Sequence, residues 1–558
     1  MNRKLFLSLS ACSLILLASC SKKVNLTASN FSVDPNPLEA QGGQVSATVS
    51  GMFPEKYVKR NQTITLTPEL RTTDGSVLRG EAATFQGEKV MGNNQTINYR
   101  LGGRFTMKSN FPYSDTYRKS DLVMVVNERK GKKVNAYDVK IGNGIIATSE
   151  LYRKTLMADG AVIAPDSFQR VQRQKQEANI RFLVNQANLR QSELKNNSVQ
   201  EFISLLQRIN ADREQLYLQN VEISAYASPE GGFAFNDKLA NKRQNNTEQY
   251  VQQKLKQSKL AGANVNAHYT AQDWEGFQQL VQASNIQDKD VILRVLSMYK
   301  DPAEREQQIR NMSEGFQELA TGILPELRRS RLTVNYEVIG RSDDEIKQQL
   351  STDATKLSPD ELLYAATLDS NLIAKEAIYQ KAAQYYDKDY RPLNNLGVME
   401  FDKGNYDQAK TYLQKAIAAN KNAGEAYANL GILALKDGDI SEAEKYIGRA
   451  ADANGYNEAA GALNIAKGNY AEAARNLKDE TSYTAALAQI LSKDYANAAK
   501  TLDAIKNPTG LESYLHAIIS ARRGNKYATE SYLEEAIERD PSLKDIADND
   551  LEFQFLRK

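Results

Sequence analysis

Two stretches of sequence, 34 residues apart, decide the fold of the C-terminal part of the chain. The first reads NNLGVMEFDKGNYDQAKTYLQKAIAAN over residues 394–420, and the second reads ANLGILALKDGDISEAEKYIGRAADAN over residues 428–454. Glycine and alanine recur at the same places in both, and small residues at fixed positions let the two helices of a unit cross closely. The interval predicts an all-α array of repeated helix pairs, which we place at residues 355–558.

This pattern resembles the tetratricopeptide repeat, whose period is about 34 residues. The resemblance implies a solenoid whose groove binds a peptide or a helix of a protein partner. The residues predicted to line that groove are Arg391, Asn394, Asn395, Glu425 and Asn429. Two interpretations of Asn395 and Asn429 stay open. Either they hydrogen-bond an extended backbone, or they are solvent-facing residues of the repeat consensus.

The N-terminus has the pattern of a secretory signal. Arg3 and Lys4 precede the apolar stretch Leu5–Ala18, which is shorter than the roughly 20 residues of a membrane span. The end of this stretch and the two residues after it, Leu17-Ala18-Ser19-Cys20, resemble the bacterial lipobox. We therefore expect residues 1–19 to be removed as a signal peptide and Cys20 to carry the lipid that anchors the protein in the outer membrane. Because Ser21-Lys22-Lys23 follows, and not an acidic run, we expect the protein to face the periplasm.

Composition argues against nucleic acid as a partner. The chain has 71 basic and 69 acidic residues, and Arg3 and Lys4 are the two basic residues of the predicted signal. The mature protein is then formally neutral, and no local basic run suggests a nucleic-acid surface. The predicted maturation removes Cys12 and acylates Cys20, so we expect neither a disulfide nor thiol chemistry.

Residues 20–152 have the pattern of an all-β sandwich. Ile64-Thr65-Leu66-Thr67 alternates apolar and polar residues, and Asp74-Gly75 follows as a hairpin turn. Residues 121–126 and 134–141 are two more predicted strands, separated by a turn that contains glycine. Regular short strands of this kind are typical of an antiparallel sandwich, and we expect it to serve as a spacer or a docking module.

Residues 166–340 alternate strands and helices and are predicted to form an α/β domain. The stretch ISAYASPEGG at 223–232, followed by Asn236 and Arg243, resembles the loop and helix of OmpA-like peptidoglycan-binding domains. In that family an aspartate and an arginine bind the zwitterionic diaminopimelate, since each supplies one charge of an ion pair. The resemblance implies that Ser228, Glu230, Asn236 and Arg243 form the site.

This loop departs from the family at one position. Ser228 stands where the family has its aspartate, and Glu230 lies two residues later. Two interpretations therefore stay open. Glu230 takes over the role of the aspartate and peptidoglycan binding is retained, or the domain has kept the fold and lost the ligand.

The sequence gives little indication of catalysis. His268 and His516, its two histidines, lie far apart and are expected to lack spaced partners for a metal site. No phosphate-binding glycine loop and no nucleophile elbow is present. We predict no enzyme activity, no cofactor and no metal. The predicted function is a scaffold or adaptor in envelope assembly or protein export. The alternatives are a tether between outer membrane and peptidoglycan, and a surface or fimbrial assembly protein.

Overall fold

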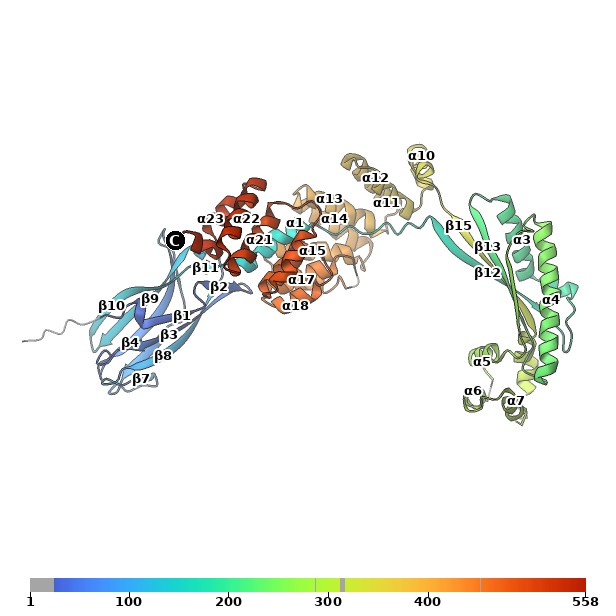
Figure 1. Cartoon of the computed structure of the whole chain (residues 1–558), viewed down its shortest axis with the longest axis horizontal. Helices are drawn as coiled ribbons and strands as arrows, with labels where there is room; N and C mark the ends of the chain where they lie inside the picture. The colour runs from blue at the N-terminus through green and yellow to red at the C-terminus, as the bar shows by residue number, and fades with distance from the viewer. Residues whose placement is uncertain (1–24, 287, 312–316, 452, 558) are drawn as a thin grey trace, which may run out of the picture. The chain divides into compact units, whose positions relative to one another are not determined.

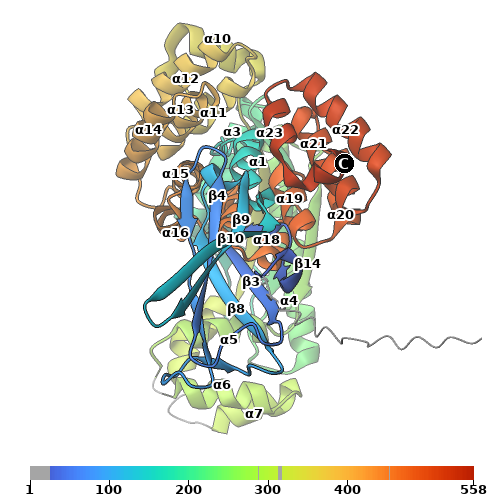
Figure 2. The same cartoon turned by 90° about the vertical axis from the view of Figure 1, so that its left-hand side faces the viewer.

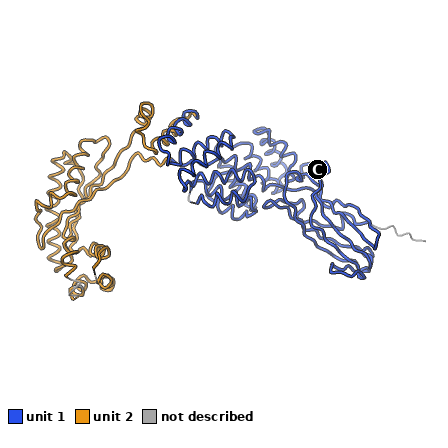
Figure 3. The backbone as a smooth tube through the Cα atoms, turned by 180° about the vertical axis from the view of Figure 1, so that it is seen from behind, with its two compact units in different colours: residues 1–165, 372–558 blue, residues 166–371 orange. Residues whose placement is uncertain are grey.

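The computed structural model describes residues 25–286, 288–311, 317–451 and 453–557. The described chain divides into two compact units (Figure 3). One unit joins residues up to 165 with residues 372–558, and the other comprises residues 166–371. The predicted signal peptide and Cys20 lie outside the described residues. Within the described ranges, we find no helix whose length and apolar character would let it cross a membrane.

The N-terminal part of the first unit is a sandwich of two sheets (Figures 1 and 2). Its strands are β1 (Phe31–Asp34), β2 (Leu38–Gln41), β3 (Gln44–Phe53), β4 (Thr63–Thr72), β5 (Val77–Arg79), β6 (Ala83–Gly87), β7 (Gln95–Ile97), β8 (Gly103–Pro112), β9 (Ser120–Lys130), β10 (Lys133–Asn143) and β11 (Ile145–Ile146). One sheet has the order β1-β3-β2-β11 with β8 on β3, and the other has the order β10-β9-β4-β6-β7 with β5 on β4. The predicted hairpin at Asp74-Gly75 joins β4 to β5 and is confirmed.

Side chains of both sheets share one core. Phe53 and Phe105 from the first sheet pack in the same cluster as Ile64, Phe85 and Met124 from the second. Inward-facing apolar residues alternate with exposed ones along β8, as expected for a strand with one buried face. The prediction of a mostly β N-terminal region is therefore confirmed.

The second unit is built on a four-stranded mixed sheet. Its strands are β12 (Val171–Arg181), β13 (Leu216–Tyr226), β14 (Val265–Thr270) and β15 (Arg329–Ile339), in the order β12-β15-β13-β14. The helices are α2 (Gln191–Leu194), α3 (Asn197–Ala211), α4 (Phe233–Gln257), α5 (Trp274–Ala283), α6 (Lys289–Met298), α7 (Pro302–Asn311), η4 (Leu319–Ile323), α9 (Leu324–Leu327), α10 (Asp343–Asp353) and α11 (Pro359–Thr367).

Helices α3 and α4 cover one face of this sheet (Figure 1). Phe202 and Leu206 of α3 and Val251 of α4 pack on Ile223 and Leu332 of the sheet. Helices α5, α6 and α9 form a separate small core around Phe277 and Leu324. This helical insertion occupies the stretch between β14 and β15.

The C-terminal part of the first unit is an array of helix pairs. The helices are α12 (Leu372–Tyr385), α13 (Tyr390–Asp402), α14 (Tyr406–Ala419), α15 (Gly424–Asp437), α16 (Ile440–Ile447), α17 (Tyr456–Ala466), α18 (Tyr470–Asn476), α19 (Tyr483–Leu491), α20 (Tyr495–Asp503), α21 (Gly510–Arg522), α22 (Lys526–Arg539) and α23 (Leu543–Asn549). The starts of α13 and α15 are 34 residues apart, as the sequence interval predicts. A Cβ at Gly397 or Gly431 would lie under 3.0 Å from a side chain of the second helix of the same pair, which is why these positions are glycine.

Candidate functional site

The chain's own segment 148–165 lies against the first helices of successive pairs. This segment contains η3 (Thr148–Leu151), α1 (Tyr152–Asp159) and an extended stretch up to Pro165. Helix α1 contacts α15, α17 and α19, and it lies among the repeat helices in Figure 1. We call the surface of α13, α15, α17 and α19 that contacts this segment the inner face of the repeats.

Asn395 and Asn429 bind the extended stretch as paired amides. The backbone N–H of Val162 donates to Asn429 Oδ1 at 2.7 Å, and Asn429 Nδ2 donates back to the Val162 carbonyl at 2.9 Å. The N–H of Ala164 donates to Asn395 Oδ1 at 2.8 Å, and Asn395 Nδ2 donates to the Ala164 carbonyl at 3.1 Å. Each asparagine thus satisfies both polar groups of one peptide residue, as a neighbouring β-strand would.

A third asparagine links the two pairs. Asn394 Nδ2 donates to the Val162 carbonyl at 3.0 Å, and its Oδ1 accepts from Asn429 Nδ2 at 3.0 Å. Asn394, Asn395 and Asn429 are all at most 1 % exposed. The interpretation of Asn395 and Asn429 as solvent-facing consensus residues is therefore wrong. The bonds from these asparagines to the segment reach main-chain atoms alone, so their hydrogen bonds recognise the backbone of the segment.

The two asparagines bind every second residue of the extended stretch, Val162 and Ala164. Val162 and Ala164 are two residues apart, so their polar backbone groups point the same way in an extended chain. Ala164 is buried, whereas Ile163 between them is 45 % exposed. The Val162 side chain fits against Gly455, where a Cβ would lie 2.1 Å from Val162 Cγ2. Gly455 also has φ +73°, a left-handed conformation that glycine adopts without strain.

Helix α1 is bound farther along the inner face through its C-terminal end. Asp159 accepts hydrogen bonds from the backbone N–H groups of Tyr483 at 2.7 Å and Thr484 at 2.9 Å. These are the first residues of α19, so the carboxylate also faces the positive end of that helix. Burial nevertheless raises the pKa of Asp159 above its ordinary value. The hydrogen bonds from Thr484 and Tyr483 lower this pKa, but they offset the effect of burial only in part.

A second carboxyl group, Glu458, lies near Asp159. Burial raises the pKa of Glu458 to about 7, and a hydrogen bond with Glu480 and the charges of Glu480 and Asp159 act in the same direction. Three carboxyl groups therefore approach one another where the extended stretch begins.

The two other predicted groove residues lie at the edge of the inner face. Arg391 is paired with Asp389 at 2.7 Å, and its Nη1 lies 3.5 Å from the Pro165 carbonyl. Glu425 is buried and accepts a hydrogen bond from the Tyr390 hydroxyl at 2.7 Å. Glu425 therefore joins α13 to α15, and within the described part of the chain it forms no hydrogen bond to segment 148–165.

The sandwich packs against the same helical array. Gln41, the last residue of β2, donates to the Gly468 carbonyl at 3.1 Å. The buried Thr148 hydroxyl donates to Glu552 at 2.5 Å, and Glu552 also accepts from Arg522 Nε at 2.9 Å. These bonds explain why the sandwich, segment 148–165 and the repeats form a single compact unit.

In the second unit, Arg243 lies beneath the loop that resembles the OmpA-like site. It is 1 % exposed, and it donates to the backbone carbonyls of Gln186 at 3.0 Å, Tyr226 at 2.8 Å and Leu183 at 3.3 Å. The Phe182 ring centroid lies 4.8 Å from its guanidinium carbon. Burial, and secondarily the charge of Arg328, lowers the pKa of Arg243 to about 10.

The acidic residue of that loop is also engaged within the chain. Two nitrogens of Arg328 donate to Glu230 Oε1, each at 2.7 Å, and the Ser228 hydroxyl donates to it at 2.9 Å. Asn236 Nδ2 donates to loop carbonyls, among them that of Ser228 at 3.0 Å. The four predicted residues are thus close together, but Arg243 and Glu230 bind the chain itself. Peptidoglycan binding stays a prediction.

The sequence analysis missed segment 153–165, which falls between two predicted domains. One local signal was present. Ala164 precedes Pro165, and a residue before proline is biased toward extended conformations. That bias predicts the conformation of the stretch, but it does not predict a binding partner more than 200 residues away in sequence.

Comparisons with known proteins bear on the repeats. A family model described as tetratricopeptide repeat matches residues 400–464. Similar solved structures include a tetratricopeptide repeat protein from Parabacteroides merdae, with 16 % identity, a TM-score of 0.29, and coverage of 38 % of this chain and 91 % of that one. A second similar structure is YrrB, described as a tetratricopeptide repeat protein with an unusual peptide-binding site. It has 18 % identity and a TM-score of 0.20, and the match covers 36 % of this chain and 94 % of YrrB.

A third similar structure is pilF of Pseudomonas aeruginosa, with 17 % identity, a TM-score of 0.22, and coverage of 38 % of this chain and 86 % of that one. No curated protein matches the chain. The C-terminal region is therefore a helical repeat array consistent with tetratricopeptide repeats, whose family model matches residues 400–464, and arrays of this kind form protein-interaction scaffolds.

Proposed function

We propose that this protein is a lipid-anchored scaffold of the bacterial envelope, which binds protein partners through the inner face of its repeats. The observation that carries the proposal is the pairing of Asn395 and Asn429 with both polar groups of Ala164 and Val162. Such pairs bind main-chain groups, so a partner's extended segment with a small apolar residue at the position of Ala164 can replace residues 161–165. The proposed setting is the periplasmic side of the outer membrane, in envelope assembly or protein export.

A labelled peptide tests whether the inner face binds a segment supplied in trans. The probe is a fluorescein-labelled peptide with the sequence of residues 159–166. Ala164→Asp places a charge at a buried position of the segment and leaves every repeat residue unchanged, so it opens the inner face. Ile163→Asp, at the neighbouring exposed position, is the matched control.

We expect the peptide to bind Ala164→Asp and not the wild type or Ile163→Asp, in which the chain's own segment competes at high effective concentration. Adding Asn395→Ala and Asn429→Ala to Ala164→Asp removes the binding. If the peptide fails to bind Ala164→Asp although the repeats keep their helical circular dichroism, the inner face does not recruit partners and serves as an internal clamp.

Anchoring is tested separately at Cys20. Cys20→Ala removes the predicted lipid acceptor, and we expect it to abolish metabolic labelling with palmitate and recovery in the membrane fraction. Cys12→Ala is the matched control, because Cys12 lies in the predicted signal. Normal labelling of Cys20→Ala would rule out the proposed anchor and leave the repeat function untouched.

The alternative function is a tether to peptidoglycan through the second unit. It requires Arg243 and Glu230 to turn from their present partners toward a ligand. The scaffold is favoured, because the inner face already binds an extended segment through exchangeable backbone contacts.

A further inference from the structure

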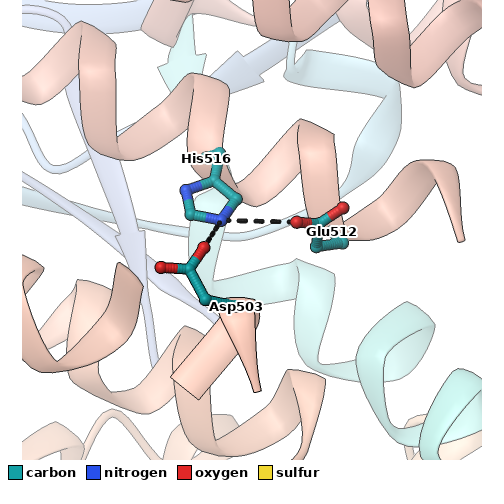
Figure 4. A group of neighbouring side chains, drawn as sticks. All are labelled: Asp503, Glu512 and His516. Carbon is teal, nitrogen blue, oxygen red and sulfur yellow. Dashed lines mark ion pairs between the residues drawn. The ribbon is translucent and has the colours of Figure 1, made fainter. Parts of the chain in front are cut away.

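His516 faces two carboxylates near the C-terminal end of the repeats (Figure 4). His516 and Glu512 lie on α21, and Asp503 is the last residue of α20. His516 Nε2 lies 3.3 Å from Asp503 Oδ1 and 3.5 Å from Glu512 Oε1. The expectation that His516 lacks a spaced partner is wrong, because Glu512 precedes it by four residues and so lies on the same helix face.

We infer that these three side chains form a binding site for a divalent transition-metal ion of the zinc type. One imidazole nitrogen and two carboxylate oxygens are ligands that zinc prefers, at about 2.0–2.2 Å from the ion. Tetrahedral ligands at that range lie about 3.4 Å apart. The two separations of His516 Nε2 from the carboxylate oxygens, 3.3 and 3.5 Å, fit that spacing. All three ligand atoms lie within 4.8 Å of one another.

The surroundings fix two ligands before an ion arrives. The His516 ring stacks on Tyr532, with ring centroids 4.9 Å apart and planes 16° apart. The second oxygen of Glu512 accepts from Arg539 Nη1 at 3.0 Å, which leaves Oε1 directed at His516. Such outer contacts orient metal ligands. The Asp503 side chain is 69 % exposed and lies on the side from which an ion can enter.

The simpler explanation is an ion pair with a protonated histidine. Nε2 of an imidazolium carries a single hydrogen, which donates well in one direction. Here two carboxylate oxygens face that nitrogen at nearly equal distances. A metal ion uses all three groups at once and leaves a fourth position for water or for a ligand from another protein. The ion would join the end of α20 to α21 across residues 504–509, between consecutive helix pairs.

Zinc titration of the full mature protein tests this inference. The protein is prepared without a histidine tag, treated with EDTA, and titrated with Zn²⁺ in a calorimeter, and Co²⁺ absorption reports the coordination. The variants are His516→Gln and Asp503→Asn. His268→Gln is the matched control, since His268 is the second of the two histidines in the sequence and lies in the other unit.

We expect one equivalent of Zn²⁺ to bind. The affinity falls by about 100-fold or more in His516→Gln and by about 10-fold in Asp503→Asn, and it is unchanged in His268→Gln. Asp503 is exposed, so Asp503→Asn keeps the fold, and its melting curve in EDTA checks this. An absence of saturable binding, or equal binding by His516→Gln and wild type, would overturn the site and show an ion pair only.

Discussion

The inner face of the repeats and the loop of the second unit were both predicted to bind a ligand, and in the structure both bind the chain itself. They differ in what they hold. Asn395 and Asn429 hold an extended stretch that runs outside the repeat core, by bonds that another backbone can replace. Arg243 holds the carbonyls of Leu183, Gln186 and Tyr226 from within its own domain. A buried polar group is thus a candidate binding residue only when its partner can leave without unfolding the domain.

The largest effect is expected at Arg243. Arg243→Ala removes a buried guanidinium and leaves three backbone carbonyls without that donor, so we expect the free energy of unfolding of the second unit to fall by about 3–5 kcal/mol. Urea unfolding followed by circular dichroism measures this, and the transition of the first unit serves as the internal control. A loss under about 1 kcal/mol would show that Arg243 is free to serve a ligand.

The double change Asn395→Ala and Asn429→Ala is expected to lower global stability less than Arg243→Ala, because the lost bonds hold only the stretch around residues 162–164 and not the repeat core. Each change leaves peptide groups of the segment unpaired, and each lost bond to a desolvated group costs about 1–3 kcal/mol. Residues 160–165 then dissociate, whereas α1 stays packed through Tyr152 and Leu156 and the repeats stay folded. Thermolysin, which cleaves before apolar residues, should cut faster before Val162 and Ile163, whereas cleavage in the second unit stays unchanged. Equal cleavage at these two sites in mutant and wild type would show that the asparagines contribute little to binding the segment.

A smaller effect is expected from pH. Glu458 has a folded pKa of about 7 against an ordinary value of 4.5, so its protonated form stabilises the folded first unit. That contribution is full below pH 4.5 and is lost as the pH rises through 7. Glu458 is partly exposed, and after a discount for solvent screening we expect about 1 kcal/mol less stability at pH 8 than at pH 5 from this group.

The matched variant for this prediction is Glu458→Gln, which mimics the protonated side chain. Urea unfolding at the two pH values should show a smaller pH dependence in Glu458→Gln than in wild type. If the two proteins lose the same stability between pH 5 and pH 8, the Glu458 carboxyl group does not titrate in this range.

The sequence predicted the repeats because their signal is local. The 34-residue interval and the glycines at 397 and 431 place α13 to α16 correctly, since each pair needs small residues where its helices cross. The start of β12 at Val171 has no such local signal. Residues 171–175 are exposed and mostly polar, so hydrophobic alternation could not reveal them, and their backbone pairing with β15 extends the strand.

The binding sites were predicted less well because they depend on distant contacts. Asn395 and Asn429 were recognised as groove residues from the repeat pattern, but their partners come from residues 162 and 164. The pairing of Glu230 with Arg328 likewise joins positions 98 residues apart. Neither pairing leaves a periodic signal in the sequence. The residue types alone therefore indicated that these side chains can form hydrogen bonds, but they did not indicate which groups of the chain are their partners.

Amide hydrogen exchange at Val162 and Ala164 tests the central claim most directly. Both N–H groups donate to buried asparagine oxygens, so we expect both to exchange far more slowly than an unstructured chain, measured by mass spectrometry with residue-level fragmentation. In the Asn395→Ala, Asn429→Ala protein both should exchange at nearly the unprotected rate, while amides of α15 stay slow. Fast exchange at both positions in the wild type would contradict the account, because the inner face would then not hold the segment in solution.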